Sequence, residues 1–336
     1  MSDDDVVRLA HGAGGRAMRA LIESVFLDGV GDPEARAMGD GAAIPLGERW
    51  LVLTADAHVV APAFFPGGDI GRLAVSGVVN DLAVMGACDV LALTSCVVVE
   101  EGFPVESLRR IHASMQAACR EANTRVITGD TKVMRKGEVD GVVLSTSGVG
   151  LADRVVRDSG LRAGDVVVVT GTLGDHGLAV LSARHGLGLE GDLRSDVAPL
   201  NGLIREALRV AGDGLHAMKD PTRGGVTSAL TEMAEKAGVS VVLDEAALPL
   251  SDAGRAAAEL LGVDPLAVAN EGKALLGVAP DALDAVLTAL RAHPLGKRAA
   301  CIGRVVEGPR GAVLLDTGFG TRRLVERDGD PLPRIC

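Results

Sequence analysis

The stretch DIGRLAVSGVVNDLAVMGA, residues 69–87, is rich in small residues and predicts a helix. It lies between two β-rich stretches, WLVLTADAHVV at 50–60 and LALTSCVVVE at 91–100. Further elements are expected in the same half of the chain: a glycine turn and helix at 9–28, an amphipathic helix at 105–123, a strand that runs into a polar loop at 125–132, and a strand at 141–150. Helices interspersed with strands predict an α/β unit.

A second series of elements begins near residue 151. We expect a buried strand, a glycine turn and a helix over 164–185, helices at 199–210, 226–238 and 280–296, and strands at 240–249, 298–308 and 311–318. The two series lack the strict alternation of a doubly wound sheet, so the predicted class is α/β with α+β character.

The chain of 336 residues has about the length of two domains of roughly 150 residues each. We place the domains at 1–150 and 151–325, followed by a flexible tail at 326–336. In the tail, Pro331 and Pro333 favour an extended segment without helix or central strand.

The composition narrows the class of protein. The net charge is −11 and no Lys/Arg cluster occurs, which argues against nucleic-acid binding. No apolar run reaches the ~18 residues that a membrane-spanning helix needs. The start, MSDDDVV, is acidic where a signal peptide would be basic and then apolar, so we expect a cytoplasmic protein with no membrane partner.

The five cysteines are an odd number, widely spaced and without a CxxC pair, which argues against a disulfide framework and a structural zinc site. Cys88, Cys96, Cys119 and Cys301 have apolar neighbours in the sequence and are expected to be buried small hydrophobes. Cys336 differs from them, because it ends the chain in the sequence PLPRIC.

Four short segments of the first half are rich in aspartate or glycine. They are HGAGG at 11–15, GDGAAI at 39–44, TAD at 54–56 together with VVND at 78–81, and TGDTK at 128–132. Their acids lie where we expect a strand or helix to meet a turn and are candidate ligands of Mg²⁺: Asp40, Asp56, Asp81 and Asp130. Each piece alone is an ordinary turn, and only their joint occurrence favours a site.

The same pieces suggest how phosphate is held, because no P-loop occurs and no GxGxxG follows a strand. HGAGG offers several backbone N–H groups to phosphate oxygens, and Lys132 offers a point charge.

Two pieces of the second half add candidate residues. In KDPTRGG, residues 219–225, Asp220, Thr222 and Arg223 precede a helix N-terminus, which suits an anion, although a turn that caps this helix explains them equally well. Glu271 in NEGK, residues 270–273, lies between apolar runs and is either a base with a raised pKa or part of a surface turn. We expect His176 to be structural.

Together these pieces resemble the HypE family of hydrogenase-maturation proteins. The family belongs to the superfamily of aminoimidazole ribonucleotide synthetase, selenophosphate synthetase and thiamine-monophosphate kinase. The resemblance runs from His11 to Cys336, on HGAGG, FFPGGDIG, VVNDLAVMGA, TGDTKV, GTLGDHG, DPTRGG, ANEGK, HPLGK and PLPRIC. The acidic and glycine pieces are shared across the superfamily, whereas the terminal PRIC is specific to the family.

The resemblance implies a two-domain PurM-like architecture that forms a homodimer through its N-terminal domain and binds ATP with Mg²⁺. It implies that Cys336 receives a carbamoyl group from HypF, that ATP-dependent dehydration gives a protein-bound thiocyanate, and that a HypC–HypD complex accepts the cyanide for the [NiFe] hydrogenase centre. It also implies nucleotide contacts from His11, Gly12, Gly14, Gly15, Asn80, Gly129, Thr131, Asp220, Thr222 and Arg223.

Glu271 and Lys132 are then the candidate bases for the two N–H protons that dehydration removes, while Cys336 is the carrier. Relatives in the superfamily often carry two adjacent acids where this chain has Asp40 and Gly41, which weakens Asp40 as a metal ligand.

Three alternatives stay open at this point. The chain could be another ATP-dependent enzyme of the superfamily, such as a small-molecule kinase or synthetase, whose activity survives loss of the tail. It could be a non-catalytic scaffold that binds maturation partners through its tail. Cys336 could also be a passive terminal residue.

Overall fold

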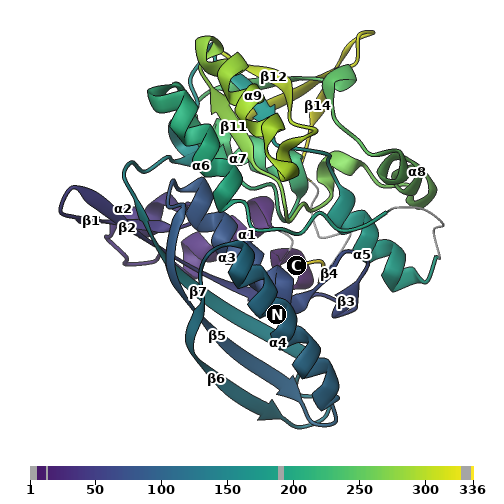
Figure 1. Cartoon of the computed structure of the whole chain (residues 1–336). Helices are drawn as coiled ribbons and strands as arrows, with labels where there is room; N and C mark the ends of the chain where they lie inside the picture. The colour runs from purple at the N-terminus through teal and green to yellow at the C-terminus, as the bar shows by residue number, and fades with distance from the viewer. Residues whose placement is uncertain (1–5, 13, 188–192, 327–333) are drawn as a thin grey trace.

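The computed structural model describes residues 6–12, 14–187, 193–326 and 334–336. Two β-sheets, one from each half of the chain, lie at opposite ends of the molecule with helices between and around them (Figure 1). Both sheets mix parallel and antiparallel pairs, which confirms the predicted α/β class. The domain boundaries after residues 150 and 325 stay predictions.

The first half forms a five-stranded sheet in the order β1-β2-β7-β5-β6. Its strands are β1 (Ala42–Leu46), β2 (Arg49–His58), β5 (Asp89–Glu100), β6 (Val126–Met134) and β7 (Val142–Ala152). Its helices are α1 (Gly15–Leu21), α2 (Pro33–Ala37), α3 (Ile70–Val84) and α4 (Val105–Glu121), and a two-stranded hairpin pairs β3 (Phe64–Phe65) with β4 (Gly68–Asp69).

Helix α3 is the stretch of small residues predicted from the sequence, and it is almost wholly buried. Asp69 caps its start by accepting from the N–H groups of Gly71 and Arg72. A Cβ at position 71 would overlap the carbonyl oxygen of Ile111, so the glycine lets α3 approach α4 closely. One face of α3 packs on β2 and β7, while Ala83 and Val84 join the core of the second half.

The second half forms a seven-stranded sheet in the order β14-β13-β10-β12-β8-β11-β9. Its strands are β8 (Val166–Val169), β9 (Leu215–Lys219), β10 (Ser240–Asp244), β11 (Leu275–Val278), β12 (Ala300–Val306), β13 (Ala312–Asp316) and β14 (Thr321–Leu324). Its helices are α5 (Asp175–His185), α6 (Asn201–Ala211), α7 (Gly225–Ala237), α8 (Asp252–Leu261) and α9 (Leu283–Ala292). Residues of α7 share one apolar core with this sheet, and residues of α6 and α9 share another.

The structure corrects the expected end of the strand at 125–132. TGDTK is not a polar loop: strand β6 continues through it to Met134 and pairs in parallel with β5, where Asp130 lies opposite Cys96. Strand β6 is the last strand of its sheet, so its unpaired edge and nearly all of its side chains are exposed. Because side chains on both faces of β6 are open to water, polar residues fit there without loss of hydration.

Other expectations need smaller corrections. Cys88 and Cys119 are buried as predicted, but Cys301 is half-buried and Cys96 is exposed. Among the four acids, only Asp40 lies in a bend of the chain; Asp56 and Asp130 lie within strands and Asp81 within α3. Helix α8 was not expected, although Ser251 caps it and Gly262 ends it in the left-handed conformation.

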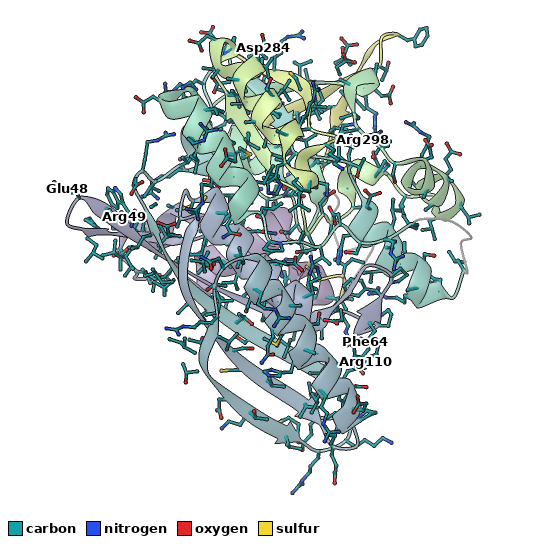
Figure 2. The ribbon with its side chains drawn as sticks, in the orientation of Figure 1. Glu48, Arg49, Phe64, Arg110, Asp284 and Arg298 are labelled. Carbon is teal, nitrogen blue, oxygen red and sulfur yellow. The ribbon has the colours of Figure 1, made fainter. Side chains whose placement is uncertain are left out.

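A cation–π contact joins helix α4 to the β3–β4 hairpin. Figure 2 shows Arg110 of α4 beside Phe64 of the β3–β4 hairpin, and the guanidinium carbon lies 4.1 Å from the ring centroid.

Within the described parts of the chain, no helix has the length and apolar character that crossing a membrane requires.

Candidate active site

A cavity of about 460 Å³ lies between the two halves and is lined by residues of both. Ten of the residues singled out in the sequence line it: Gly14, Gly15, Asp40, Asp56, Asp81, Asp220, Thr222, Arg223, Glu271 and Cys336. Motifs that are far apart in the chain therefore meet at one place. The glycine piece reaches the cavity at Gly14, whose φ of 79° suits glycine and where an added Cβ would lie 3.3 Å from the Cβ of Arg223.

Strand β2 and helix α3 supply the acidic wall. Thr54, Asp56 and His58 are at every second position of β2, so their side chains share one face of the sheet. Thr54 Oγ1 donates to Asp81 Oδ2 over 2.8 Å. A Cβ at Gly77 of α3 would lie 2.7 Å from His58 Nε2, so glycine there leaves room for the ring.

The carboxyl groups of this wall repel one another in a buried setting. Burial and the nearby charges of Asp56, Asp220 and Asp40 hold the pKa of Asp81 well above its usual range. Burial and the charge of Asp40 raise the pKa of Asp220 to about 8. Such a cluster gains free energy from a proton or a cation, so Asp56, Asp81 and Asp220 have the chemistry that suits a divalent metal ion. No three His, Cys, Asp or Glu side chains of the described residues already surround one point as ligands.

Asp40 differs from the other acids because it is already paired. It accepts from the ammonium of Lys219, the last residue of β9, which also lies 3.6 Å from Glu232 Oε2. Burial opposes the charge of Lys219, yet Asp40, Glu232 and Asp158 hold its pKa well above the usual value. Sequence analysis missed Lys219, whose only signal was its place directly before Asp220.

Glu271 is not part of a surface turn. Its side chain is 3% exposed, and its Oε1 is buried without a hydrogen-bond partner among the residues that the structure describes. Burial, followed by the charges of Asp220, Asp196 and Asp56, holds its pKa well above the usual range. A desolvated carboxylate that faces a cavity is suited to accept a proton from a bound group.

The last three residues are held by hydrogen bonds, and Cys336 lines the cavity. Val59 N–H donates to the carbonyl oxygen of Cys336 over 3.2 Å, and Ala61 N–H donates to that of Arg334 over 3.1 Å. His176 lies 2.8 Å from the carbonyl oxygen of Ile335, and Arg184 donates to that of Arg334 over 2.6 Å. The Ile335 side chain is 4% exposed, so the chain end is packed as part of the core.

Cys336 is half-buried and lines the cavity, where negative charge on it raises the pKa of Arg223. The predicted tail at 326–336 thus has its last three residues seated in the cleft. Residues 327–333 lie outside the described residues.

Six predicted residues lie away from the cavity of this chain. Gly129, Asp130, Thr131 and Lys132 lie on the exposed strand β6, where Lys132 Nζ is 2.8 Å from Asp130 Oδ2. The hydrogen bond from Asp130 raises the pKa of Lys132, which keeps it protonated. His11 and Gly12 lie in a short 3₁₀ turn, Leu9–Gly12, where His11 Nδ1 accepts from the N–H of Arg8 over 3.0 Å.

Asn80 lies behind the cavity and is fully buried. Its amide nitrogen donates to the carbonyl oxygens of Ala198 and Glu271, and its oxygen accepts from the N–H of Leu200. The side chain therefore ties α3 to the second half and positions the backbone of Glu271.

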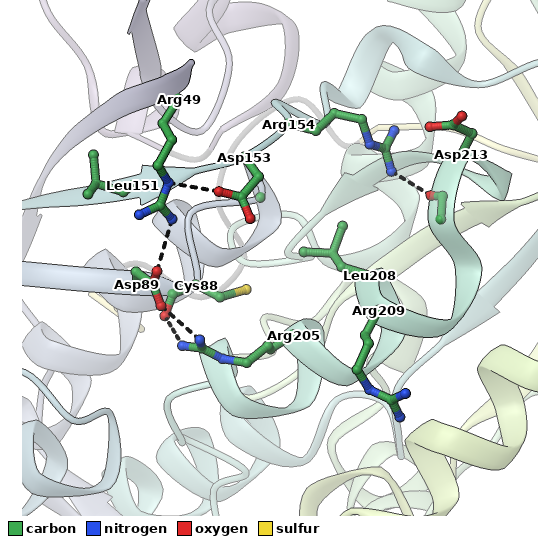
Figure 3. Close-up of a pocket in the computed structure, with 12 residues that line it drawn as sticks. Arg49, Cys88, Asp89, Leu151, Asp153, Arg154, Arg205, Leu208, Arg209 and Asp213 are labelled. Carbon is green, nitrogen blue, oxygen red and sulfur yellow. Dashed lines mark hydrogen bonds and ion pairs between the residues drawn. The ribbon is translucent and has the colours of Figure 1, made fainter. Parts of the chain in front are cut away.

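A second cavity of about 500 Å³ contains none of the predicted residues (Figure 3). Its arginines have partners: Arg49 and Arg205 both bind the carboxylate of Asp89, Arg209 binds Glu206, and Arg154 donates to the carbonyl oxygen of Gly212. Because these charges are already paired, the acidic cavity is the better candidate for chemistry.

Comparisons with known proteins show which family the chain is similar to. The chain matches the family models described as AIR synthase related protein, N-terminal domain, at residues 38–152, and AIR synthase related protein, C-terminal domain, at residues 162–316. It is 46% identical over 333 residues to a protein of Rhizobium leguminosarum bv. viciae named carbamoyl dehydratase HypE, a match that covers 98% of this chain and 95% of the relative.

Solved structures give the same picture. The chain resembles the structure of a HypE–HypF complex with a TM-score of 0.86 and 42% identity, over 92% of this chain and 100% of the other. It resembles HypE in complex with ATP with a TM-score of 0.82 and 38% identity, over 98% of this chain and 100% of the other.

Proposed function

This chain belongs to the HypE family of carbamoyl dehydratases, and from that premise we propose that it dehydrates a carbamoyl group carried on its own last residue. The group is bound covalently to the sulfur of Cys336 as a thiocarboxamide. ATP-dependent loss of water converts it into a thiocyanate that supplies cyanide to a [NiFe] hydrogenase. The observation that carries the proposal is the seat of Cys336 in the same cavity as Glu271 and the acidic wall.

The chemistry requires a phosphoryl donor and a base. The amide oxygen is a poor leaving group, so it attacks the γ-phosphorus of ATP and ADP departs. The C–O bond then breaks with release of phosphate, the nitrogen loses both of its protons, and a C≡N bond forms while the S–C bond stays intact. The oxygen of the amide leaves in the phosphate.

Glu271 is the proposed acceptor of one N–H proton. It is buried and lines the cavity, and one of its carboxyl oxygens has no hydrogen-bond partner in the described part of the chain, so a thiocarboxamide N–H can bind there without displacing a described contact. Raised basicity from desolvation favours this transfer. Lys132, the other candidate, would have to lose the proton that Asp130 stabilises before it could act as a base.

The nucleotide is expected to bind at the glycine and arginine side of the same cavity. The HypE relative solved with ATP supports ATP as the donor. In this chain Gly14 and Gly15 present backbone with little steric cover, and Thr222 and Arg223 precede the N-terminus of α7. Asp56, Asp81 and Asp220 would hold Mg²⁺, which would offset the charge of the transferred phosphoryl group.

Strand β6 suggests how Gly129, Asp130, Thr131 and Lys132 contribute. They lie on an unpaired sheet edge that also exposes the apolar side chains of Val126, Ile127 and Val133. Exposed edges of this kind favour pairing with another chain. We therefore propose a homodimer in which β6 of one copy brings Asp130 and Lys132 to the cavity of the other.

The partners follow from the chemistry. The relative solved with HypF supports HypF as the carbamoyl donor, and an iron-bearing HypC–HypD complex is the proposed acceptor. The thiol has to reach both partners and the cavity. The seat of residues 334–336 is then one of several positions of the chain end. We propose the cytoplasm as the compartment.

Intact-protein mass spectrometry tests the proposal. With HypF, carbamoyl phosphate and ATP, the mass of the protein should rise by one carbamoyl group and then fall by one water, with both changes in the C-terminal peptide. A mass that never rises rejects the carrier role. A small-molecule kinase of the same fold would keep its ATP turnover after removal of Cys336, whereas the proposed enzyme would not turn over.

A further inference from the structure

Ser195 and Asp196, two adjacent residues that the reaction above does not use, lie between the chain end and Glu271. Ser195 Oγ is 2.8 Å from His176 Nδ1, and His176 Nε2 is 2.8 Å from the carbonyl oxygen of Ile335. Asp196 Oδ1 accepts from the N–H of Glu271 over 3.2 Å. Ser195 thus contacts His176, which binds the residue before Cys336, while Asp196 contacts Glu271, the proposed base.

The hydrogen bonds on the tail side have a defined direction. A carbonyl oxygen can only accept, so Nε2 of His176 carries the proton and Nδ1 accepts from the hydroxyl of Ser195. The ring is fully buried, and desolvation lowers its pKa, which keeps it neutral. Ser195 is itself held, because its N–H donates to Pro66 and its Oγ accepts from Val197 N–H.

The contacts on the Glu271 side are equally tight. Asp196 Oδ2 lies 3.1 Å from Lys273 Nζ, and both side chains are almost completely buried. A Cβ at Gly272 would overlap the carbonyl oxygen of Asp196, so the glycine lets the two segments touch. The backbone of Glu271 is therefore fixed, while its Oε1 has no partner within the described ranges of the chain.

We propose that Ser195 and Asp196 are positioning residues that couple the seat of the chain end to the placement of Glu271. When Ile335 occupies its site, His176 and Ser195 hold the segment in the place that aligns Asp196 with the Glu271 backbone; when the chain end leaves, both sides loosen together. The inference rests on the proposed function for the roles of Cys336 and Glu271. The coupling itself requires only the contacts given above.

Coupling between two sites is reciprocal, and this gives a test that needs no catalysis. The full-length protein is treated with iodoacetamide, and alkylation of Cys336 is followed in the C-terminal peptide by mass spectrometry. The Asp196 side chain bonds to Glu271 N–H and Lys273 and, among the described residues, makes no hydrogen bond or ion pair with residues 334–336, and Asp196→Asn should speed alkylation of Cys336 about five- to tenfold. Asp165→Asn, a substitution at another buried aspartate paired with His216, is the matched control and should leave the rate unchanged.

The tail side is tested in the same assay and in dehydration. Ser195→Ala should speed alkylation by a similar factor and slow single-turnover dehydration of the carbamoylated protein, while Ser195→Thr, which keeps the hydroxyl, restores both rates. Ser240→Ala, which removes a different buried hydroxyl bonded to Pro309, is the control.

Equal alkylation rates in Asp196→Asn and the unaltered protein overturn the coupling. If Asp196→Asn does not fold, Asp196→Asn combined with Lys273→Met removes both charges and takes its place, with the same two outcomes. Absence of dehydration in the unaltered protein would reject the proposed function instead, because alkylation requires neither ATP nor HypF.

Discussion

The N–H of Val59 donates to the carbonyl oxygen of Cys336 over 3.2 Å, so the last residue of the chain lies directly beyond the end of strand β2. The same strand carries Asp56 and His58 on the face that lines the cavity. A terminal thiol is thereby placed in the same cavity as the carboxyl groups of Asp56 and Asp81.

Cys336→Ala should abolish carbamoylation without weakening the fold, because the side chain is half-buried and only its sulfur is lost. Intact mass with HypF and ATP measures the first effect, and urea denaturation measures the second. Cys96→Ala removes an exposed thiol of β5 and should be carbamoylated normally. A carbamoyl group on the Cys336→Ala protein would contradict the carrier role.

Glu271→Gln should accumulate the carbamoyl form and slow dehydration by about 10²-fold or more, since the amide cannot accept the proton. Quenched single-turnover reactions read by mass spectrometry give the rate. Glu259→Gln on the exposed side of α8 is the control. Dehydration at the normal rate would remove Glu271 from the mechanism.

Lys219→Met should lower the free energy of unfolding by about 3–5 kcal/mol, because it leaves the carboxylate of Asp40 buried without its cation. Combining it with Asp40→Asn should recover part of that loss. Urea titration of the three proteins measures both changes. Equal stability of the single variant and the original protein would show that Lys219 does not hold this charge.

Stability should fall as pH rises because of Asp220. Its pKa is about 8 in the folded protein and about 3.9 in an unfolded chain. Between these values the unfolded chain has released a proton that the folded protein keeps, so the free energy of unfolding decreases by up to about 1.4 kcal/mol per pH unit. Below pH ~4 and above pH ~8 this contribution is constant.

Denaturant titrations at several pH values between 5 and 8 test this. Asp220→Asn cannot ionise and should show a shallower slope than the original protein. Asp281→Asn, at an exposed position, should keep the original slope. Parallel slopes for Asp220→Asn and the original protein would place the proton elsewhere.

Asp130→Ala should keep the carbamoyl form but stop dehydration, and it should leave the midpoint of urea denaturation unchanged because the residue is exposed. If a second copy supplies Asp130, mixing the Asp130→Ala and Cys336→Ala proteins should restore dehydration. In a mixed dimer, the cavity of the Asp130→Ala chain keeps Cys336 and receives Asp130 from strand β6 of the Cys336→Ala chain. Failure of the mixture to dehydrate, with dimers present by light scattering, would argue against a shared site.

Local sequence was sufficient to predict most helices and the strands β2, β5, β6 and β7 of the first half, but it did not predict β1 or the β3–β4 hairpin. Periodic apolar positions put Ile111, Met115 and Cys119 on the buried face of α4, as expected. The local sequence was insufficient to predict that strand β6 continues through TGDTK, because polar residues at one exposed edge of a sheet have the composition of a loop. The local sequence also left undecided whether Glu271 is buried, since NEGK suits a turn as well as a buried segment.

The sequence by itself determined which chemical groups the protein contains. They come from the acidic and glycine-rich segments, from DPTRGG, and from a cysteine at the end of the chain. Only the tertiary structure decided which of these groups meet. Asp40 pairs with Lys219, His176 holds Ile335, and Asp130 lies outside the cavity of its own chain. The reason is physical: composition and spacing act within a few residues of chain, whereas burial, pKa shifts and hydrogen-bond partners depend on segments that only the packing of two sheets brings together.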